Sequence, residues 1–312
     1  MPVLDTLVSP MGPREFTMFR ELVHQRTGIW LRDGKQLMLA SRLSRRLRHH
    51  GLTSFADYYA IVQNDQSDSE EIHELINCVT TNKTSFFRER HHFEFLANTV
   101  IPQIESASRP DAPKCIRVWS GACSTGEEPY SIAITLLESL QALHNSKHGD
   151  GPQPAQMRAG LPGLNLALGP WRIEIVASDI DTAVLETAKR AVYKHDSLET
   201  VDPSLHGKYF LLGKDDMQGH VKVKQDVVRL IQFKRINLMD FQWPLDGLFD
   251  VIFFRNALIY FNRETQDIFL RKMARYLKPG GYLFLGHSEH IPWLGDVFAP
   301  LNQTMYRLRG KR

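Results

Sequence analysis

The stretch IRVWSGACSTGEEPYSIAITLLESLQAL, residues 116–143, predicts the fold of most of this chain. It begins as an apolar run of strand length, passes through a turn with two glycines, and continues as a long run with helical periodicity. Further apolar strand patterns follow it, several of them separated by helical patterns, at 172–180, 227–238, 248–256 and 281–289. Such alternation predicts an α/β fold with a parallel, Rossmann-like sheet covered by helices on both faces.

Smaller units are predicted around this sheet. Residues 14 to about 80 have helical patterns, and Leu39, Leu43 and Leu47 recur at the spacing of one buried helix face. TMYRLR, residues 304–309, is predicted as an edge strand. The expected organisation is an all-helical domain over 1–81 and a sheet domain over 82–312, the latter with an inserted antiparallel β-subdomain at about 205–235 and a flexible Gly/Pro-rich insertion at about 143–170.

Composition limits the class of protein. Hydrophobic residues make up 43% of the chain and charged residues 23%, as is typical of globular proteins. No apolar run approaches the roughly 20 residues of a membrane span, and the N-terminus has no signal-peptide pattern. The three cysteines have no paired spacing, which fits a reducing compartment. We therefore expect a cytoplasmic protein without direct membrane insertion.

The net charge of +3 is unevenly distributed. Residues 14–48 contain nine Lys/Arg and three acids, and a helical spacing unites Arg42, Arg45, Arg46 and His49. This basic face indicates an acidic partner, and the alternative is a solvated face without one. Nucleic acid is one acidic partner, but few aromatic residues are interleaved with the charges, so we expect no nucleic-acid binding.

Three features converge at the carboxyl ends of the predicted strands, where ligands bind in such sheets. The turn SGACSTGEE (120–128) is expected to bring backbone close to a ligand at its glycines. Asp179 ends the second strand, where an acid can accept both hydroxyls of a ribose. Arg255 and Asn256 end the fourth strand as a charge and an amide within an apolar run. We expect a ligand and a substrate carboxylate to be their partners; the alternative is an internal ion pair with an acid such as Asp250.

The charge pattern indicates the kind of ligand. The dinucleotide motif G-x-G-x-x-G is absent, since the turn reads G-x-x-x-x-G, and Glu127 and Glu128 follow at the start of the helix. Acids there would repel a pyrophosphate, which relies on the positive end of that helix. They suit a ligand with an ammonium or sulfonium group and a ribose. S-adenosylmethionine carries all three and has no phosphate.

Five long segments carry a family resemblance, and the likeness runs in order from about residue 14 to the C-terminus. They are TTNKTSFFRERHHF (80–93), RVWSGACSTGEEPYSIAITL (117–136), ASDIDTAVLETAKRAVY (177–193), FFRNALIYF (253–261) and LKPGGYLFLGHSE (277–289). In these segments the chain resembles the chemoreceptor glutamate methyltransferases, the CheR family. That family transfers the methyl group of S-adenosylmethionine to glutamates on the cytoplasmic helices of chemotaxis receptors. The resemblance implies a class I methyltransferase sheet, S-adenosylhomocysteine as product and methyl-accepting chemoreceptors as partners.

The resemblance also implies roles for single residues. Those that would hold the cofactor are Asn82, Thr84, Arg88, Glu127 or its neighbour Glu128, Asp179 at the ribose, Asn237 and Leu238 beside the adenine, Arg255 and Asn256. The basic helix with Arg42, Arg45 and Arg46 would dock the receptor. A glutamate is already ionised at pH 7, so its methylation needs no general base. We predict that Arg88 holds this carboxylate as a bidentate fork and that Tyr260 steers it near the transferred methyl group.

Four histidines invite a metal interpretation, because imidazole is a common metal ligand. They are His91, His92, His287 and His290. Their spacings come without a third ligand that the sequence can place, so we predict no metal and interpret them as loop or core histidines.

The subdomain turn GKDDMQG (213–219) bears on a second receptor contact. In the family, this subdomain can bind a C-terminal peptide tether of some receptors as an added strand. The turn has the length of the tether-binding versions, but Asp215 lies near its middle and the central glycine of their pattern is missing. The sequence leaves tether binding open.

Two other functions compete with receptor methylation. One is methylation of another substrate class, such as nucleic acid; the enzymes that methylate amino groups there present an Asn/Asp-Pro-Pro-aromatic turn after strand four, where this chain has Arg-Asn-Ala-Leu (255–258). The other is a binding module that kept the fold without the reaction, against which the intact acid, arginine and tyrosine set argues. We therefore predict a protein-glutamate O-methyltransferase.

Overall fold

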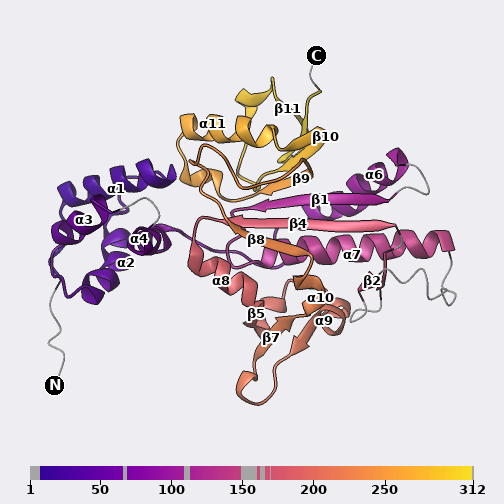
Figure 1. Cartoon of the computed structure of the whole chain (residues 1–312), viewed down its shortest axis with the longest axis horizontal. Helices are drawn as coiled ribbons and strands as arrows, with labels where there is room; N and C mark the ends of the chain where they lie inside the picture. Colours follow the sequence, from indigo (N-terminus) through magenta and orange to yellow (C-terminus); the bar gives the residue numbers. More distant parts are fainter. Residues whose placement is uncertain are drawn as a thin grey trace.

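The computed structural model describes residues 8–65, 69–108, 113–148, 160–161, 166–168 and 170–310. These residues form a mixed sheet flanked by helices, an all-helical N-terminal part and a smaller antiparallel sheet (Figure 1). Among them, no helix combines the length and the apolar character that a membrane crossing requires.

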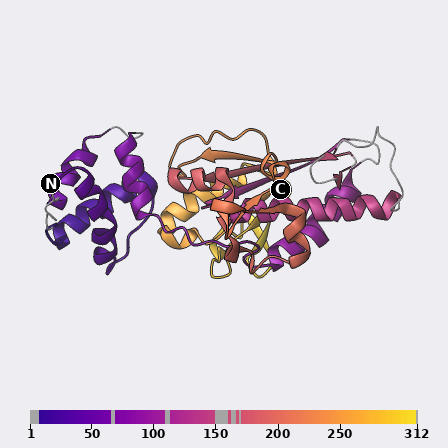
Figure 2. The same ribbon diagram turned by 90° about the horizontal axis from the view of Figure 1, so that it is seen from below.

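The N-terminal helices pack around an apolar core of their own. They are α1 (Pro13–Thr27), α2 (Gln36–His49), α3 (Phe55–Gln63) and α4 (Glu70–Val79). The helix face predicted from Leu39, Leu43 and Leu47 is confirmed, since all three side chains are fully buried in α2. Ser54 and Ser69 cap α3 and α4 by accepting backbone N–H groups that a helix start leaves unpaired. This helical cluster forms one end of the molecule (Figure 2).

An extended segment over 80–85 leads from this cluster toward the sheet. It continues into α5 (His91–Phe95), a π-helical turn η1 (Leu96–Val100) and α6 (Ile101–Ala107). These helices pack into the core on one face of the sheet, and no element is predicted for them from the sequence. The expected boundary between 1–81 and 82–312 falls in the extended segment and stays a prediction.

The central sheet has the strand order β11-β12-β10-β9-β1-β4-β8. Its parallel strands are β1 (Lys114–Gly121), β4 (Trp171–Asp179), β8 (Ile231–Arg235), β9 (Phe249–Phe254) and β10 (Leu277–Phe284). Two antiparallel strands extend it, β11 (Phe298–Asn302) and β12 (Met305–Leu308). The predicted parallel, Rossmann-like sheet is confirmed. The prediction of an edge strand over 304–309 is wrong, because β12 pairs with β10 on one side and with β11 on the other.

Alternate side chains of the strands fill separate cores on the two faces of the sheet. In β1, Val118 belongs to the core that includes α7 (Glu127–His148), and the next residue, Trp119, belongs to the core that includes α11 (Arg263–Ala274). Successive strand residues point to opposite faces, so a strand buried on both faces is apolar throughout. This explains why the continuous apolar runs predicted the two helical layers correctly.

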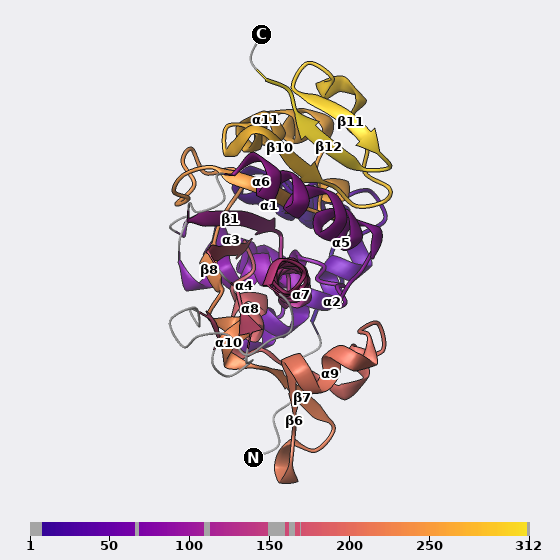
Figure 3. The same ribbon diagram turned by 90° about the vertical axis from the view of Figure 1, so that its right-hand side faces the viewer.

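A small antiparallel sheet follows α8 (Thr182–Arg190). Its strands, in spatial order, are β5 (Val192–Lys194), β7 (His220–Val223) and β6 (Phe210–Leu212). The expected range of about 205–235 is shifted, because the sheet begins with β5 and because residues 231–235 form β8 of the main sheet. Figure 3 shows this small sheet at the opposite end of the view from the C-terminal strands.

Most of the flexible insertion expected at 143–170 lies outside the described residues. In the described part, α7 continues to His148 and so extends into the expected insertion. Two short strands, β2 (Gly160–Leu161) and β3 (Leu166–Ala167), pair with each other.

Candidate functional site

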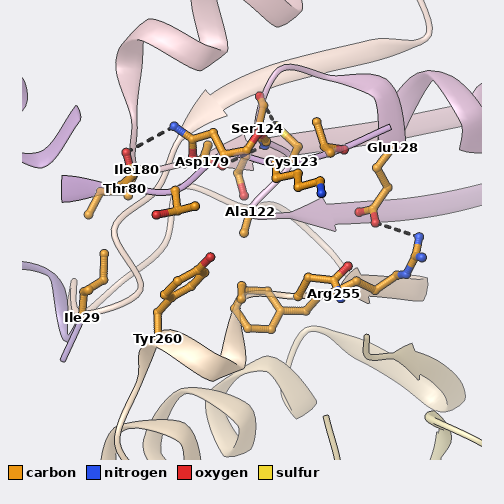
Figure 4. Close-up of a pocket in the computed structure, with 18 of the residues that line it drawn as sticks. Ile29, Thr80, Ala122, Cys123, Ser124, Glu128, Asp179, Ile180, Arg255 and Tyr260 are labelled. Carbon is orange, nitrogen blue, oxygen red and sulfur yellow. Dashed lines mark hydrogen bonds and ion pairs between the residues drawn. The ribbon is translucent and has the colours of Figure 1, made fainter. Parts of the chain in front are cut away.

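A pocket opens at the carboxyl ends of β1, β4, β8 and β9 (Figure 4). In chain order, β4 and β8 follow β1 on one side, whereas β9 and β10 lie on its other side. Ligands bind at such a reversal of strand order because two crossover connections leave the sheet in opposite directions there. The helical cluster also contributes to the wall, through Thr27, Ile29 and Val79. The pocket therefore lies where the sheet meets the N-terminal helices.

The turn after β1 approaches the pocket with side-chain-bearing residues. Residues 122–124 line the pocket, and both Ala122 and Ser124 adopt positive φ angles, of 56° and 51°. The glycines of the turn are not among the described lining residues. A Cβ on Gly126 would lie 2.8 Å from the Cβ of Ala188 in α8, so this glycine permits close packing of the turn on that helix. The structure thus gives Gly126 a packing role, and close approach of the glycine backbone to a ligand stays a prediction.

Asp179 ends β4 inside the pocket, where the sequence predicts a ribose-binding acid. Its Oδ2 accepts the backbone N–H of Ser124 at 2.9 Å, and its Oδ1 accepts that of Asp181 at 3.0 Å. Burial raises its pKa to about 6, despite these hydrogen bonds to the charged form. Each carboxylate oxygen keeps a further lone pair. Asp179 can therefore accept two more hydrogen bonds from a ligand.

Of the two acids after the turn, Glu128 lines the pocket and Glu127 does not. Glu127 is buried and accepts the hydroxyl of Thr125 at 2.7 Å. Glu128 accepts the hydroxyl of Ser120 at 2.7 Å and lies 3.1 Å from Arg255. Burial raises the pKa of Glu128, and the charge of Arg255 opposes that rise. The expected ligand contact of Glu127 does not fit this structure, whereas that of Glu128 does.

Arg255 lies at the end of β9 and is held by three protein groups. Its guanidinium is 3.2 Å from a Glu89 oxygen and 3.1 Å from a Glu128 oxygen, and it also donates to the carbonyl of Arg88. The side chain is only 1% exposed, so its charge depends on these partners. Burial by itself raises the pKa of Glu89. The charge of Arg255 and a hydrogen bond from Asn256 outweigh this effect and lower the pKa to about 2.

These partners differ from both sequence interpretations of Arg255. The expectation that a ligand and a substrate carboxylate pair with it is wrong, because internal acids already do. The alternative, an internal ion pair, is confirmed, but the acids that pair with Arg255 are Glu89 and Glu128 and not Asp250. Asp250 pairs with Lys278 at 2.8 Å, and its other partner is a backbone N–H of β1. Arg255 and Asn256 nevertheless line the pocket as predicted.

Glu289 is a buried acid that holds the turn after β9, a role that is not predicted from the sequence. Its carboxylate accepts the backbone N–H groups of Asn256 and Leu258 at 2.8 Å and that of Gly286 at 2.7 Å. Asn256 has a φ of 59°, which is uncommon for a residue other than glycine. Glu289 therefore fixes the strained turn that presents Arg255 and Asn256 to the pocket. In the sequence it stands at the end of the segment LKPGGYLFLGHSE, five residues after the last residue of β10.

The segment that joins the helical cluster to the sheet runs along the pocket wall. Asn82 lines the pocket, but its amide donates to Asp181 at 2.7 Å, and its carbonyl accepts the Ser124 hydroxyl at 2.9 Å. Asn82 therefore clamps the segment onto the turn after β1 and the start of α8. Thr84 and Arg88 also line the pocket, as predicted.

Arg88 and Tyr260 bring available polar groups to this wall. Arg88 donates to the carbonyl of Lys83 at 2.9 Å, and none of the described acids pairs with it. The Tyr260 hydroxyl has no hydrogen-bond partner among the described residues, while the Tyr260 carbonyl accepts the N–H of Trp30 at 2.7 Å. Tyr260 lies across the pocket from Asp179 (Figure 4). Both side chains are therefore free to bind a ligand or substrate.

Of the two residues expected beside the adenine, Leu238 lines the pocket and Asn237 does not. The Asn237 amide donates to the carbonyl of Arg26 at 2.7 Å and so joins the sheet to the end of α1. The apolar part of the wall that adjoins Asp179 consists of Ile180, Ile236 and Leu238.

The basic face predicted on α2 is partly engaged within the protein. Arg42 donates to three carbonyls at the end of α4, at 3.3, 3.0 and 2.7 Å. Arg46 pairs with Glu71 and has a side chain only 12% exposed. Arg45 is exposed. The expectation that all three arginines serve docking is therefore too broad, and Arg45 is the one that α2 presents to solvent.

Two family models match nearly the whole chain. The model described as the all-alpha domain of CheR methyltransferase matches residues 14–80, and the model described as the SAM binding domain of CheR methyltransferase matches 82–148 and 164–307.

Curated relatives match over a similar extent. The chain is 41% identical over 299 residues to "Chemotaxis protein methyltransferase" of Klebsiella aerogenes, covering 96% of this chain and 91% of that protein. It is 40% identical over 298 residues to the protein of the same name from Escherichia coli, covering 96% and 92%. Among solved structures, an rRNA methylase from Streptococcus thermophilus is similar over 74% of this chain and 100% of that one, at 10% identity and a TM-score of 0.34, which is too distant to support an argument.

Proposed function

Because the chain belongs to the CheR methyltransferase family, we propose that it methylates glutamate side chains on the cytoplasmic helices of chemotaxis receptors. As a member, it is an S-adenosylmethionine-dependent methyltransferase of chemotaxis. The carboxylate acceptor and the receptor are the parts that we add. The products would be a glutamate methyl ester and S-adenosylhomocysteine.

The residues of the pocket fit S-adenosylmethionine. Asp179 has two lone pairs available for the ribose hydroxyls, and the apolar wall that adjoins it suits an adenine. Glu128 would face the ammonium or sulfonium group of the cofactor, while Lys83 would face its carboxylate. When bound, the cofactor supplies a methyl group activated by its positively charged sulfur.

One observation carries the choice of a carboxylate acceptor: Arg88 gives the pocket a guanidinium with no acid partner among the described residues, while the acids of the wall, Glu128 and Asp179, already accept hydrogen bonds from the protein. The described lining residues include no histidine, and burial raises the pKa of the Cys123 thiol well above its usual value. An amine or hydroxyl acceptor must lose a proton during methylation, whereas an ionised glutamate need not. Arg88, which has no acid partner of its own among the described residues, can hold that glutamate.

The remaining catalytic work is alignment and exclusion of water. The acceptor oxygen must approach the methyl group in line with its bond to sulfur, which positioning groups favour. Tyr260 and Arg88 could bind the two carboxylate oxygens. Trp30 and Ile259 are 39% and 45% exposed and adjoin lining residues in the chain, so they offer apolar contacts to an incoming helix. Covering the pocket with that helix would strengthen every charge interaction inside it.

The proposed function is tested with methyl-labelled S-adenosylmethionine and receptor cytoplasmic fragments. We expect label on the wild-type fragment that is released as methanol by base, because esters hydrolyse and methylated amines do not. The matched control is a fragment whose acceptor glutamates are replaced by alanine, which should stay unlabelled. Base-stable label, or label on nucleic acid in place of the receptor, would refute the proposal.

We predict that Tyr260→Phe lowers kcat for receptor methylation by about tenfold, because a hydrogen bond to a charged group contributes about 1.5–3 kcal/mol and about 1.4 kcal/mol is tenfold in rate. Its hydroxyl has no partner among the described residues, so the change should leave stability and S-adenosylmethionine affinity nearly unaltered.

Arg88→Ala should lower kcat/KM for the receptor more strongly, because it removes a charged partner of the carboxylate. Rates and cofactor dissociation constants are measured side by side. Unchanged turnover in both variants would show that neither residue acts on the acceptor.

The docking role of α2 is tested by Arg45→Glu, with Arg46→Glu as the contrast. Arg45 is exposed, so we expect several-fold weaker receptor binding at an unchanged melting temperature. Arg46→Glu should instead lower the melting temperature, because it places a third acid beside Glu71 and Glu74. Binding is measured by calorimetry at low and physiological salt. Equal receptor affinity of Arg45→Glu and wild type at low salt would remove α2 from the docking surface.

Tether binding by the small sheet stays a separate proposal. Within the part of the chain that the structure describes, its outer strands β5 and β6 each pair on one side only, which leaves an edge where a peptide could add as a strand. Calorimetry with receptor C-terminal peptides decides whether they bind.

A further inference from the structure

Glu89, His91 and His92 bring three metal-ligand atoms together. They lie next to the pocket proposed for the methyl donor S-adenosylmethionine, called the donor pocket below. One ligand atom from each residue lies within 4.8 Å of the other two. The sequence shows the two histidines but not that Glu89 is their third companion. Each oxygen of the Glu89 carboxylate also meets a protein group, since Oε2 lies 3.2 Å from the Arg255 guanidinium and Oε1 accepts the Asn256 amide at 3.2 Å.

The surroundings of His92 favour one of its two neutral tautomers. His92 is fully buried, stacks on Phe284, and has its Nε2 3.4 Å from the Oγ1 of Thr304. The Thr304 hydroxyl donates its own proton to the carbonyl of Leu285 at 2.8 Å. Oγ1 then accepts from His92 when the ring proton is on Nε2, the tautomer that satisfies both contacts of Thr304. The neutral ring then has its lone pair on Nδ1.

That lone pair faces another acceptor. His92 Nδ1 lies 3.6 Å from Glu89 Oε2, and neither atom has a hydrogen-bond partner among the described residues. His91 Nε2 is likewise buried without such a partner, and Glu89 Oε2 has only the ion pair with Arg255. Buried polar atoms are normally satisfied, and facing lone pairs repel each other. A cation that both atoms can bind would remove this conflict.

We propose that Glu89, His91 and His92 form a binding site for a divalent transition-metal ion of the zinc type. Two imidazoles and one carboxylate are a common zinc ligand set, with a fourth position open to water or another side chain. His287 is suited to that position, since its Nδ1 lies 3.3 Å from Glu89 Oε1 and its side chain is 71% exposed. Thr304 orients His92 from behind, as partners of metal-bound histidines do.

The charges around the site set limits on its affinity. Arg255 lies 3.2 Å from Glu89 and opposes a dication, but Glu128 lies 3.1 Å from the same guanidinium and offsets its charge. The group of Arg255, Glu89 and Glu128 thus carries one net negative charge, which favours a cation over an anion.

The metal site is coupled to the donor pocket through Glu89. A metal on Oε2 competes with Arg255 for that oxygen, while Oε1 accepts the amide of Asn256 at 3.2 Å. Arg255 and Asn256 both line the pocket. Metal binding therefore shifts the affinity for S-adenosylmethionine, and the cofactor shifts the affinity for the metal by the same factor.

Cobalt titration of the full chain, without cofactor or receptor, tests this site independently of the methylation proposal. We expect one equivalent of Co²⁺ to give the visible absorption of a four-coordinate ion and to be displaced by Zn²⁺. His91→Ala, at a half-buried position, should weaken binding about tenfold or more and remain folded, and His92→Gln should abolish it. The matched control is His195→Ala, an exposed histidine near the small sheet, which should bind like wild type.

Three outcomes would overturn the proposal. The first is the absence of a saturable cobalt spectrum in the wild type. The second is equal binding by His91→Ala and wild type, which would mean adventitious binding elsewhere. The third is a set of nitrogen NMR signals that shows a doubly protonated His92 at neutral pH. The coupling is checked by measuring S-adenosylmethionine affinity with and without saturating Zn²⁺. An unchanged cofactor affinity in a chain that binds one Zn²⁺ at these residues would refute the coupling.

Discussion

Arg255→Met is expected to lower the free energy of unfolding by about 3–5 kcal/mol, the usual cost of removing one partner of a buried ion pair. The guanidinium is 1% exposed and compensates both Glu89 and Glu128. Methionine fills a similar volume but leaves two carboxylates close together in a desolvated place. Urea unfolding at pH 7, followed by circular dichroism, measures the loss. Lysine is a poor substitute, because a point charge cannot reach both acids as the planar fork does.

The pH dependence of this loss distinguishes charge from packing. In the wild type the pKa of Glu89 is about 2, lowered from 4.5, so its ionisation adds stability above about pH 4.5 that is lost as pH falls toward 2. The difference between wild type and Arg255→Met should therefore shrink below about pH 4.5. The matched control is Arg271→Met, which removes an ion pair with the half-buried Asp267 and the exposed Asp296 and should unfold like wild type. A difference between wild type and Arg255→Met that does not change with pH would assign the effect to packing.

Asp179→Asn is expected to weaken S-adenosylmethionine binding by roughly 100-fold, since a hydrogen bond to a charged group contributes about 1.5–3 kcal/mol and 1.4 kcal/mol is tenfold. The amide keeps the shape of the side chain but replaces one acceptor with a donor that faces a ribose hydroxyl. Stability should change little at pH 7. The lost hydrogen bond from a backbone N–H is offset by relief of a buried charge whose pKa is raised to about 6. Calorimetry of cofactor binding, together with urea unfolding, separates the two effects.

The raised pKa of Asp179 also predicts a pH profile for cofactor binding. The pKa of about 6 in the folded apoprotein lies above the ordinary 3.8, so folding favours the protonated form more than the unfolded chain does. The stability that this carboxyl contributes is fully present below pH 3.8 and is lost as pH rises through 6. The ionised form is the one that accepts ribose hydroxyls. Affinity for S-adenosylmethionine should therefore be constant above about pH 6 and fall by up to tenfold per pH unit below it. Asp179→Asn should show a flat profile, and a wild-type profile just as flat from pH 5 to 7 would show that this carboxylate does not bind the ribose.

The parallel sheet, its two helical layers and the buried face of α2 could be predicted because they rest on local periodicity. A strand buried on both faces must be apolar throughout, and a helix with one buried face must repeat every three or four residues. Leu39, Leu43 and Leu47 therefore had one reasonable interpretation. Asp179 and the pair Arg255–Asn256 were predicted on the pocket wall for a related reason, since polar residues at the carboxyl ends of parallel strands meet at one edge of the sheet.

The partners of these polar residues depended on the tertiary structure alone. Glu89 and Glu128 reach Arg255 only because the segment before α5 and the turn after β1 meet at the end of β9. Glu289 holds the Asn256 turn from the end of β10, and the contacts of Asn237 and Arg46 likewise come from distant elements. Hydrophobic patterning is a property of neighbours in the chain, so the sequence by itself determined the layers. Charge compensation is a property of neighbours in space, so only the folded chain decided which acid each buried cation meets.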